Sequence, residues 1–236
     1  MKVSAVIVAK ATSLRLKNKN MLPFGESTVL GHKINQLKQC ERINEVIVGS
    51  DCDKILEYSE SLGAVPIKRP EKYCDESVSV ANDMIKNMMS LIKRKDVILW
   101  AHCTNPNIQP ETYDKAIETY ENSLNKPIFD WVTDEYFDSL VSVDKVQEHL
   151  WKIYRDEYGR PYNFRPWNEP HPFAKDLPPF WKQNGAIFIQ SYKNMKENNY
   201  FFAKHPYLFE TPTEESHDIN SELDYHIAQT INEKYF

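Results

Sequence analysis

The chain has 236 residues, enough for one large α/β domain or two small ones with a substantial buried core. Its formal net charge of −5 argues against a general nucleic-acid-binding surface, and no stretch approaches the roughly 20 apolar residues that span a bilayer. The four cysteines are scattered, and they form neither a C-x-x-C pair nor a zinc-site pattern. The sequence also shows no secretory leader. We therefore expect a soluble cytoplasmic protein with neither nucleic acid nor membrane as partner.

Strand-like and helix-like segments alternate along the first half of the chain. Short apolar runs predict strands, and apolar residues at helical spacing predict the segments between them to be helices. Such alternation is typical of parallel strands joined by right-handed helical crossovers, so we expect an α/β fold with a mainly parallel, doubly wound sheet flanked by helices. The predicted strands are residues 2–9, 45–51 and 96–101, and the predicted helices are residues 28–39, 53–62, 77–92 and 110–120.

The sequence pattern changes after Phe129. Residues 131–182 are rich in aromatic residues and proline and show no helical period, so we interpret them as an excursion from the core, an arm that packs on a second subunit. A long ordered surface insertion is the alternative, and composition alone leaves both open. A strand at 186–190 and a helix at 221–233 follow, so we expect residues 1–236 to form a single domain.

Polar segments follow three of the predicted strands. They are the basic loop at residues 10–19, "GSD" at residues 49–51 and "HCTNP" at residues 102–106. Ligands of doubly wound sheets bind at the carboxyl ends of the strands, so we expect these segments to meet in one crevice. Backbone amides and basic side chains suit a polyphosphate, although the loop is neither a P-loop nor a G-x-G-x-x-G loop. A solvated surface loop is the alternative explanation of the basic run.

Several short motifs share their order with one enzyme family. The basic loop follows the pattern A-R-x-x-S-x-(G/R)-(I/L)-x-x-K-N, except that Lys10 replaces the arginine, which keeps the charge but loses the bidentate guanidinium. Further on come "GHKIN", "VIVGSD", "KRPEKYCDESVSV", "HCTNP", "DLPPFWKQNGAIFI" and "HDINSELDY". Together these motifs resemble the CMP-N-acetylneuraminate (acylneuraminate) cytidylyltransferases over almost the whole chain. The matching positions of the loop are Ala9, Lys10, Ser13, Arg15, Leu16, Lys19 and Asn20.

This resemblance implies a Rossmann-like nucleotidyltransferase fold, a Mg²⁺ requirement and a homodimer in which the region after the central sheet is the exchange arm. It implies an enzyme that transfers CMP from CTP to an acidic 2-keto-3-deoxy sugar, with release of pyrophosphate, for surface glycan biosynthesis. The implied catalytic residues are Lys10, Arg15 and Lys19, which would hold the triphosphate. The implied substrate-binding residues are Ala9, Ser13, Asn20, Arg69, Ser79, His102, Thr104, Lys175, Lys182 and Asn184. The implied metal ligands are Asp218 and Asn220.

The chain also departs from the family pattern at informative positions. The two aspartates of the metal motif D-I-D are Asp218 and Asn220 here, so the second position offers only a neutral oxygen. The base-reading glutamine is His102, which either contacts a pyrimidine edge or is a satisfied histidine at the end of a strand. Lys175 and Lys182 stand where the family has an acceptor-facing arginine pattern, and they would meet a carboxylate only as point charges.

Two other functions are compatible with these residues. One keeps CTP but changes the acceptor to the eight-carbon acid Kdo or a small phosphorylated compound, which the Arg15-Leu16 pair favours. The other is a nucleotide-binding relative that lost its second metal ligand and acts as a regulatory or scaffold subunit. Pyrophosphate release from CTP with a panel of acceptors would separate the three.

Overall fold

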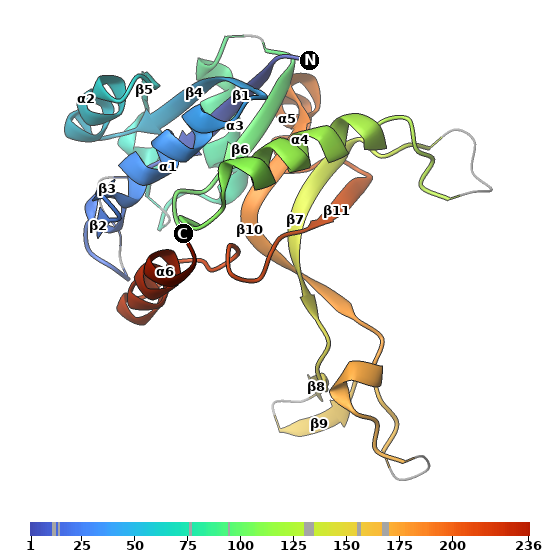
Figure 1. Ribbon diagram of the computed structural model, residues 1–236. Coiled ribbons are helices and arrows are strands. Elements are labelled where there is room, and N and C mark those ends of the chain that lie inside the picture. Colours follow the sequence, from blue (N-terminus) through green and yellow to red (C-terminus); the bar gives the residue numbers. More distant parts are fainter. Residues whose placement is uncertain are drawn as a thin grey trace.

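The computed structural model describes residues 1–10, 13, 15–75, 77–93, 95–129, 135–154, 157–166 and 170–236. Its centre is a seven-stranded sheet in the order β11-β7-β10-β6-β1-β4-β5. β10 runs antiparallel to its neighbours β6 and β7, and the remaining pairs of the sheet are parallel, which confirms the predicted mainly parallel sheet (Figure 1). The strands are β1 (Val3–Val8), β4 (Ile43–Ser50), β5 (Val65–Lys68), β6 (Val97–Ala101), β7 (Ser139–Val146), β10 (Phe180–Ser191) and β11 (Pro206–Glu210).

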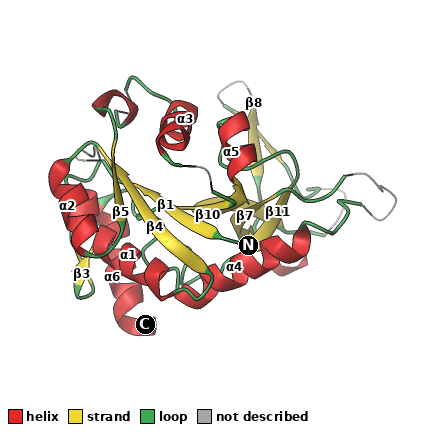
Figure 2. Ribbon diagram, turned by 90° about the horizontal axis from the view of Figure 1, so that it is seen from above, coloured by secondary structure: helices red, strands yellow, loops and turns green. Residues whose placement is uncertain are grey.

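Helices cover both faces of this sheet (Figure 2). Successive strand residues point to opposite faces, so Ile7 packs into one apolar core and Val6 into the other. The result is the three-layer arrangement of an α/β fold. One face carries α1 (Val29–Gln39), α2 (Asp53–Ser61), α4 (Pro110–Ser123) and α6 (Glu222–Tyr235), and the other carries α3 (Ala81–Leu91) and α5 (Tyr192–Asn198).

The strands and helices predicted from the sequence are present. Their bounds agree within four residues, except that β10 begins at Phe180 whereas the predicted strand began at Ala186. The sequence did not predict β5, β7, β11 or α5. No helix among the described residues is long and apolar enough to cross a membrane. The short elements are η1 (Lys19–Met21), β2 (Pro23–Phe24), β3 (Ser27–Thr28), η2 (Glu71–Tyr73), β8 (Trp151–Tyr154), β9 (Tyr158–Pro161) and η3 (Ala174–Asp176).

The excursion predicted at residues 131–182 is shorter than expected. Residues 139–143 are buried in β7, inside the central sheet, so this part belongs to the core. The rest forms an arm, here residues 144–182, in which β7 and β10 leave the body side by side and end in the β8–β9 hairpin (Figure 1). Residues 131–134, 155–156 and 167–169 of the predicted excursion lie outside the described residues. The packing of the arm on a second subunit stays a prediction.

The arm leaves the sheet at an irregularity in β10. The pairing of β10 with β7 shifts register between Gln183 and Phe188, and Gly185 takes a φ of 76° that favours glycine. Hydrogen bonds of the Asn184 and Ser142 side chains take the place of the backbone hydrogen bonds between β10 and β7 that are missing there. The Ser142 hydroxyl donates to Asn184 Oδ1 at 2.6 Å and accepts from the Ile187 amide at 2.8 Å. The "NGAI" motif therefore builds the root of the arm.

One basic side chain lies fully buried between α1 and α4. Lys33 Nζ donates a hydrogen bond to the Tyr113 hydroxyl at 2.8 Å. Burial lowers the pKa of Lys33 from 10.5 to about 7. The unfolded chain keeps the higher pKa, so between these two values it binds the proton that the folded chain has lost. Stability should therefore rise with pH from pH 7 upward.

Replacing Lys33 with methionine should stabilise the protein at pH 7 by about 1–3 kcal/mol, because the buried amine is removed while its volume is kept. The gain should shrink at pH 9, where the folded wild type already holds the neutral amine. Urea unfolding of both proteins at the two pH values measures this. Lys115→Met, at an exposed lysine of α4, is the matched control. An equal gain at both pH values, or a loss at pH 7, would contradict the assignment.

Candidate active site

A pocket of about 460 Å³ opens at the carboxyl ends of β1, β5 and β6. Its walls come from the loop after β1, the segment between β5 and α3, the end of β6, Phe201 after α5, and the segment before α6. We call this last segment the strap, residues 211–221. This position in the fold is where doubly wound sheets bind ligands.

Most of the residues predicted as site residues line this pocket. They come from segments far apart in the chain, so the fold brings together what the motifs had only placed in order. The predicted residues that line the pocket are Lys10, Ser13, Arg15, Lys19, Asn20, Arg69, Ser79, His102, Thr104, Asp218 and Asn220.

Four predicted substrate-binding residues do not line the pocket. Ala9 is buried, and its amide donates to the Gly49 carbonyl at 3.0 Å. Asn184 is occupied at the arm root, where its amide also donates to Asp144 and Thr211. Lys182 pairs with Asp144 at 2.8 Å, and Lys175 lies on η3 in the arm. Within this chain these four side chains are structural or belong to the arm.

The expectation that "GSD" joins the crevice is wrong. Ser50 and Asp51 lie outside the pocket, and the Ser50 hydroxyl accepts from the Cys52 amide at 3.1 Å. The segment after β5 takes this place, because β5 is the edge strand beyond β4 and its carboxyl end carries Arg69. The sequence could not show this, because β5 itself was not predicted.

Two residues anchor the basic loop to the rest of the site. Lys19 Nζ donates to the Ile219 carbonyl of the strap at 2.8 Å. Asn20 is buried, its amide donates to the Lys10 carbonyl at 3.0 Å, and its Oδ1 accepts from the Cys103 thiol at 3.0 Å. The alternative of a merely solvated loop does not fit these contacts. Asn20 therefore holds the loop against Cys103, and its contact with a phosphate stays a prediction.

Arg69 is buried in the wall of the pocket. Its Nε donates to Asn87 at 3.2 Å and its Nη2 donates to the Tyr73 carbonyl at 3.0 Å. Nη1 is also buried and has no hydrogen-bond partner among the described residues. Burial lowers the pKa of Arg69, and no carboxylate is paired with it in the described part of the chain. A cation left with an unused donor in a pocket wall suits a ligand with oxygen acceptors.

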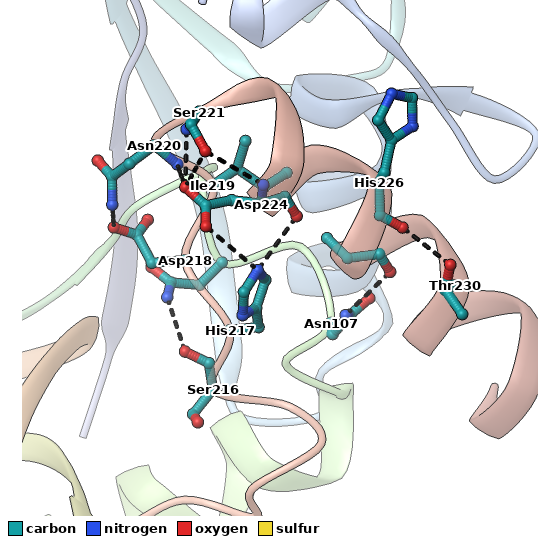
Figure 3. A network of polar contacts seen from close by, with 12 residues as sticks. Asn107, Ser216, His217, Asp218, Ile219, Asn220, Ser221, Asp224, His226 and Thr230 are labelled. Atoms are coloured by element: carbon teal, nitrogen blue, oxygen red, sulfur yellow. Dashed lines mark hydrogen bonds and ion pairs between the residues drawn. The ribbon is translucent and has the colours of Figure 1, made fainter. Parts of the chain in front are cut away.

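The strap presents the two residues of the metal motif (Figure 3). Asn220 Nδ2 donates a hydrogen bond to Asp218 Oδ2, and the Asn220 backbone amide donates to Asp224 at 3.0 Å. Asp224 also accepts from the Ser221 amide at 2.7 Å, so it is the N3 residue of a capping box in which Ser221 is the N-cap of α6. The cap fixes the strap where it enters the helix and so holds Asp218 at the pocket.

These donors fit a magnesium ion that is held mainly by its substrate. Mg²⁺ takes oxygen ligands and usually keeps waters, so one carboxylate with phosphate oxygens suffices. If the site holds Mg²⁺, Asp218 would supply that carboxylate, and the amide oxygen of Asn220 would be a neutral second ligand. Among the described residues no group of three or more His, Cys, Asp or Glu side chains could hold a metal by itself.

Much of the remaining wall of the pocket is apolar, and the sequence analysis did not predict it. The Trp100 indole is buried, and the Phe201 ring lies 5.5 Å from it, edge to face. Val80 and Met84 add further apolar surface from the start of α3. No local motif marks these residues, because each faces the pocket only once α3 and α5 have packed on the sheet. Tyr73, Cys74 and Asp75 complete the wall between η2 and α3.

Comparison with known proteins agrees with this geometry. The sequence profile described as Cytidylyltransferase matches residues 4–158. The chain belongs to the cytidylyltransferase family. It is therefore a nucleotidyltransferase by family, as the motifs implied.

Several relatives are cytidylyltransferases or CMP-sugar synthases that are named after acidic sugars. The chain is 24% identical over 250 residues to an N-acylneuraminate cytidylyltransferase of Escherichia coli, covering 99% of this chain but only 52% of that protein. It is 26% identical over 241 residues to the CMP-N,N'-diacetyllegionaminic acid synthase of Legionella pneumophila, covering 99% and 97% of the two chains. It is also 23% identical over 237 residues to a pseudaminic acid cytidylyltransferase of Campylobacter jejuni, covering 98% of this chain and 96% of that protein.

Solved cytidylyltransferase structures share the fold. A CMP:2-keto-3-deoxy-manno-octonic acid synthetase complexed with CTP superimposes with a TM-score of 0.67 at 13% identity, covering 100% of both chains. A 4-diphosphocytidyl-2C-methyl-D-erythritol synthase from Anaerococcus prevotii gives a TM-score of 0.66 at 11% identity, covering 99% of this chain and 96% of that one. At these identities the likeness concerns the fold alone.

Proposed function

We propose that this cytidylyltransferase transfers CMP from CTP to an acidic 2-keto-3-deoxy sugar of the nonulosonate type and releases pyrophosphate. The observation that carries the proposal is the single pocket in which the basic loop, Arg69, His102 and Asp218 meet. The names of the relatives, which include neuraminic, legionaminic and pseudaminic acids, support the acceptor class. Surface glycan biosynthesis is the proposed use of the product, and the cytoplasm its proposed location.

The protein's part in this reaction is positioning and charge neutralisation. The acceptor hydroxyl attacks the α-phosphorus of CTP, and the bond from that phosphorus to the bridging oxygen breaks. Lys10, Arg15 and Lys19 supply positive charge for the triphosphate, and Arg69 offers its unused donor to an oxygen of the nucleotide. The apolar wall of Trp100 and Phe201 excludes water, which strengthens these interactions.

Magnesium is the proposed cofactor. Asp218 would hold the ion, with Asn220 as a neutral second ligand. When bound, the ion would neutralise phosphate charge and help pyrophosphate to leave.

A panel of acceptors tests the proposed function. Purified protein is incubated with CTP, Mg²⁺ and one acceptor at a time: N-acylated nine-carbon keto acids, Kdo, or a small phosphorylated alcohol. We expect pyrophosphate release with a nine-carbon acid. Release with Kdo or the phosphorylated alcohol alone would move the acceptor to the alternative class. Tight CTP binding without release would favour a nucleotide-binding relative.

We also propose that the protein is a homodimer held together by the arm. The arm carries more exposed apolar surface than a lone surface extension should expose to water. Its large exposed apolar side chains, with their exposed fractions, are Trp151 60%, Ile153 69%, Tyr154 44%, Tyr158 57%, Tyr162 58%, Phe173 72% and Trp181 43%. An apolar surface on a projecting two-stranded arm suits a second copy of the chain.

Ile153→Arg should shift the protein from dimer to monomer in sedimentation velocity, because it buries a charge in the proposed interface. Acceptor turnover should fall more than CTP affinity. Val65→Arg, at an exposed apolar residue of the edge strand β5, is the control and should remain dimeric. A dimeric Ile153→Arg protein would remove this part of the arm from the interface.

A further inference from the structure

His102 is held in the pocket with its hydrogen-bonding capacity unused. The imidazole is half-buried at the end of β6, with ring centroids 5.6 Å from Phe201 and 5.9 Å from Phe188. A Cβ at Gly185 would come 3.7 Å from Nδ1, so the Nδ1 edge of the ring faces β10 and Nε2 lies on the opposite edge. Neither ring nitrogen has a hydrogen-bond partner in the described part of the chain. Aromatic packing therefore orients the ring and leaves Nε2 for a ligand.

The surroundings of this histidine favour a neutral ring. Burial is the largest effect and lowers the pKa of His102, Lys19 lowers it further, and the carboxylate of Asp218 partly offsets both. No hydrogen bond or ion pair joins either residue to the ring among the described contacts. The aromatic side chains that pack on the ring are Phe188 of β10 and Phe201 after α5, and neither is titratable. A neutral imidazole can accept a proton at the ring nitrogen that carries none.

The other titratable side chains of the pocket are less suited to accept a proton. Burial raises the pKa of Cys103 to about 11 and also raises the pKa of Cys74, so both thiols hold their protons. The Ser77 hydroxyl and amide lower the pKa of Asp75, which makes that carboxylate a weaker base. The Asn220 amide already donates to Asp218. The basic side chains are donors: Lys10, Arg15, Lys19 and Arg69.

The proposed transfer reaction, on which this inference rests, releases one proton from the acceptor hydroxyl. We propose that His102 is the general base that takes this proton. The acceptor oxygen forms its bond to the α-phosphorus of CTP. The bond from that phosphorus to the bridging oxygen breaks, and its electron pair leaves with pyrophosphate. The hydroxyl proton moves to Nε2 of His102, which passes it to water.

His102→Gln separates this role from reading the cytosine. Glutamine keeps a donor and an acceptor for a pyrimidine edge but cannot take up a proton. We expect kcat to fall about 100-fold or more, with the CTP dissociation constant in titration calorimetry changed by less than about 2-fold. Free imidazole should restore part of the rate of His102→Gly. His226→Gln, at an exposed histidine of α6 outside the pocket, should behave as wild type (Figure 3).

The outcomes against this proposal are distinct from those against the proposed function. A His102→Gln protein with wild-type kcat would overturn the base role while the transfer reaction stands. So would a loss that appears wholly in CTP affinity, because it would assign His102 to the base-binding contact. A wild-type protein that releases no pyrophosphate with any acceptor would overturn the proposed function, and the base role with it.

Discussion

Asp218→Asn should lower turnover by about 100- to 1000-fold, because it removes the carboxylate proposed to hold Mg²⁺ at the triphosphate. Raising the magnesium concentration should restore only part of the rate. The variant has two amides at these positions, whereas the wild type has one carboxylate and one amide. The fold should be unaffected, because Asp224 and Ser221 cap α6 independently of Asp218. Glu222→Gln makes the same change of charge at an exposed residue outside the pocket and should leave the rate unchanged.

Asn220→Asp should act in the opposite direction. The Asn220 amide now donates to Asp218, and an aspartate there would replace this bond by a repulsion that a bound cation relieves. The magnesium concentration for half-maximal rate should therefore fall, with turnover retained. Measuring this concentration for the wild type and the variants completes the test. An unchanged rate and magnesium dependence in Asp218→Asn would place the metal elsewhere.

Lys19→Ala should raise the CTP dissociation constant by about 10- to 100-fold and lower turnover, because a charge-assisted contact to phosphate is lost. Lys19 also joins the loop to the strap through its hydrogen bond to the Ile219 carbonyl. In the variant the loop and the strap should therefore move apart. Lys17→Ala is the matched control, since Lys17 lies in the same loop but is exposed and outside the pocket. Calorimetric titration with CTP measures the dissociation constant of each variant. Equal affinities for the two variants would mean that net charge alone attracts the nucleotide.

Local sequence patterns were sufficient to predict the strands that carry the proposed nucleotide-binding end of the site. β1, β4 and β6 each contain a short apolar run that is buried on both faces, and such runs are visible without knowledge of their partners. β7 escaped prediction because Ser139 and Ser142 interrupt its apolar pattern. Both serines are fully buried, and their hydroxyls accept bonds from the Ala203 and Ile187 amides. Such partners lie more than 40 residues away and cannot be inferred locally.

The same limit applies to the predicted site residues that do not line the pocket. Asn184 belongs to a motif that resembles the family, but its amide and carbonyl are used at the bulge of β10 by Ser142, Asp144 and Thr211. A motif shows that a residue matters and does not show what it contacts. Trp100 was predicted to be buried in a strand, yet its place in the pocket wall depends on Phe201, about 100 residues further along the chain.

The most direct test of the central claim is phosphorus NMR of one reaction mixture containing the protein, CTP, Mg²⁺ and a nine-carbon N-acylated keto acid. The transfer predicts that the three CTP resonances disappear together. A pyrophosphate resonance and a single phosphodiester resonance of a CMP ester should replace them. Their intensities should be in a 2:1 ratio, because pyrophosphate contains two equivalent phosphorus atoms, and omission of the acceptor should leave CTP intact. CTP that is unchanged in the presence of every acidic sugar, or converted to CDP or CMP without an ester, would contradict the account.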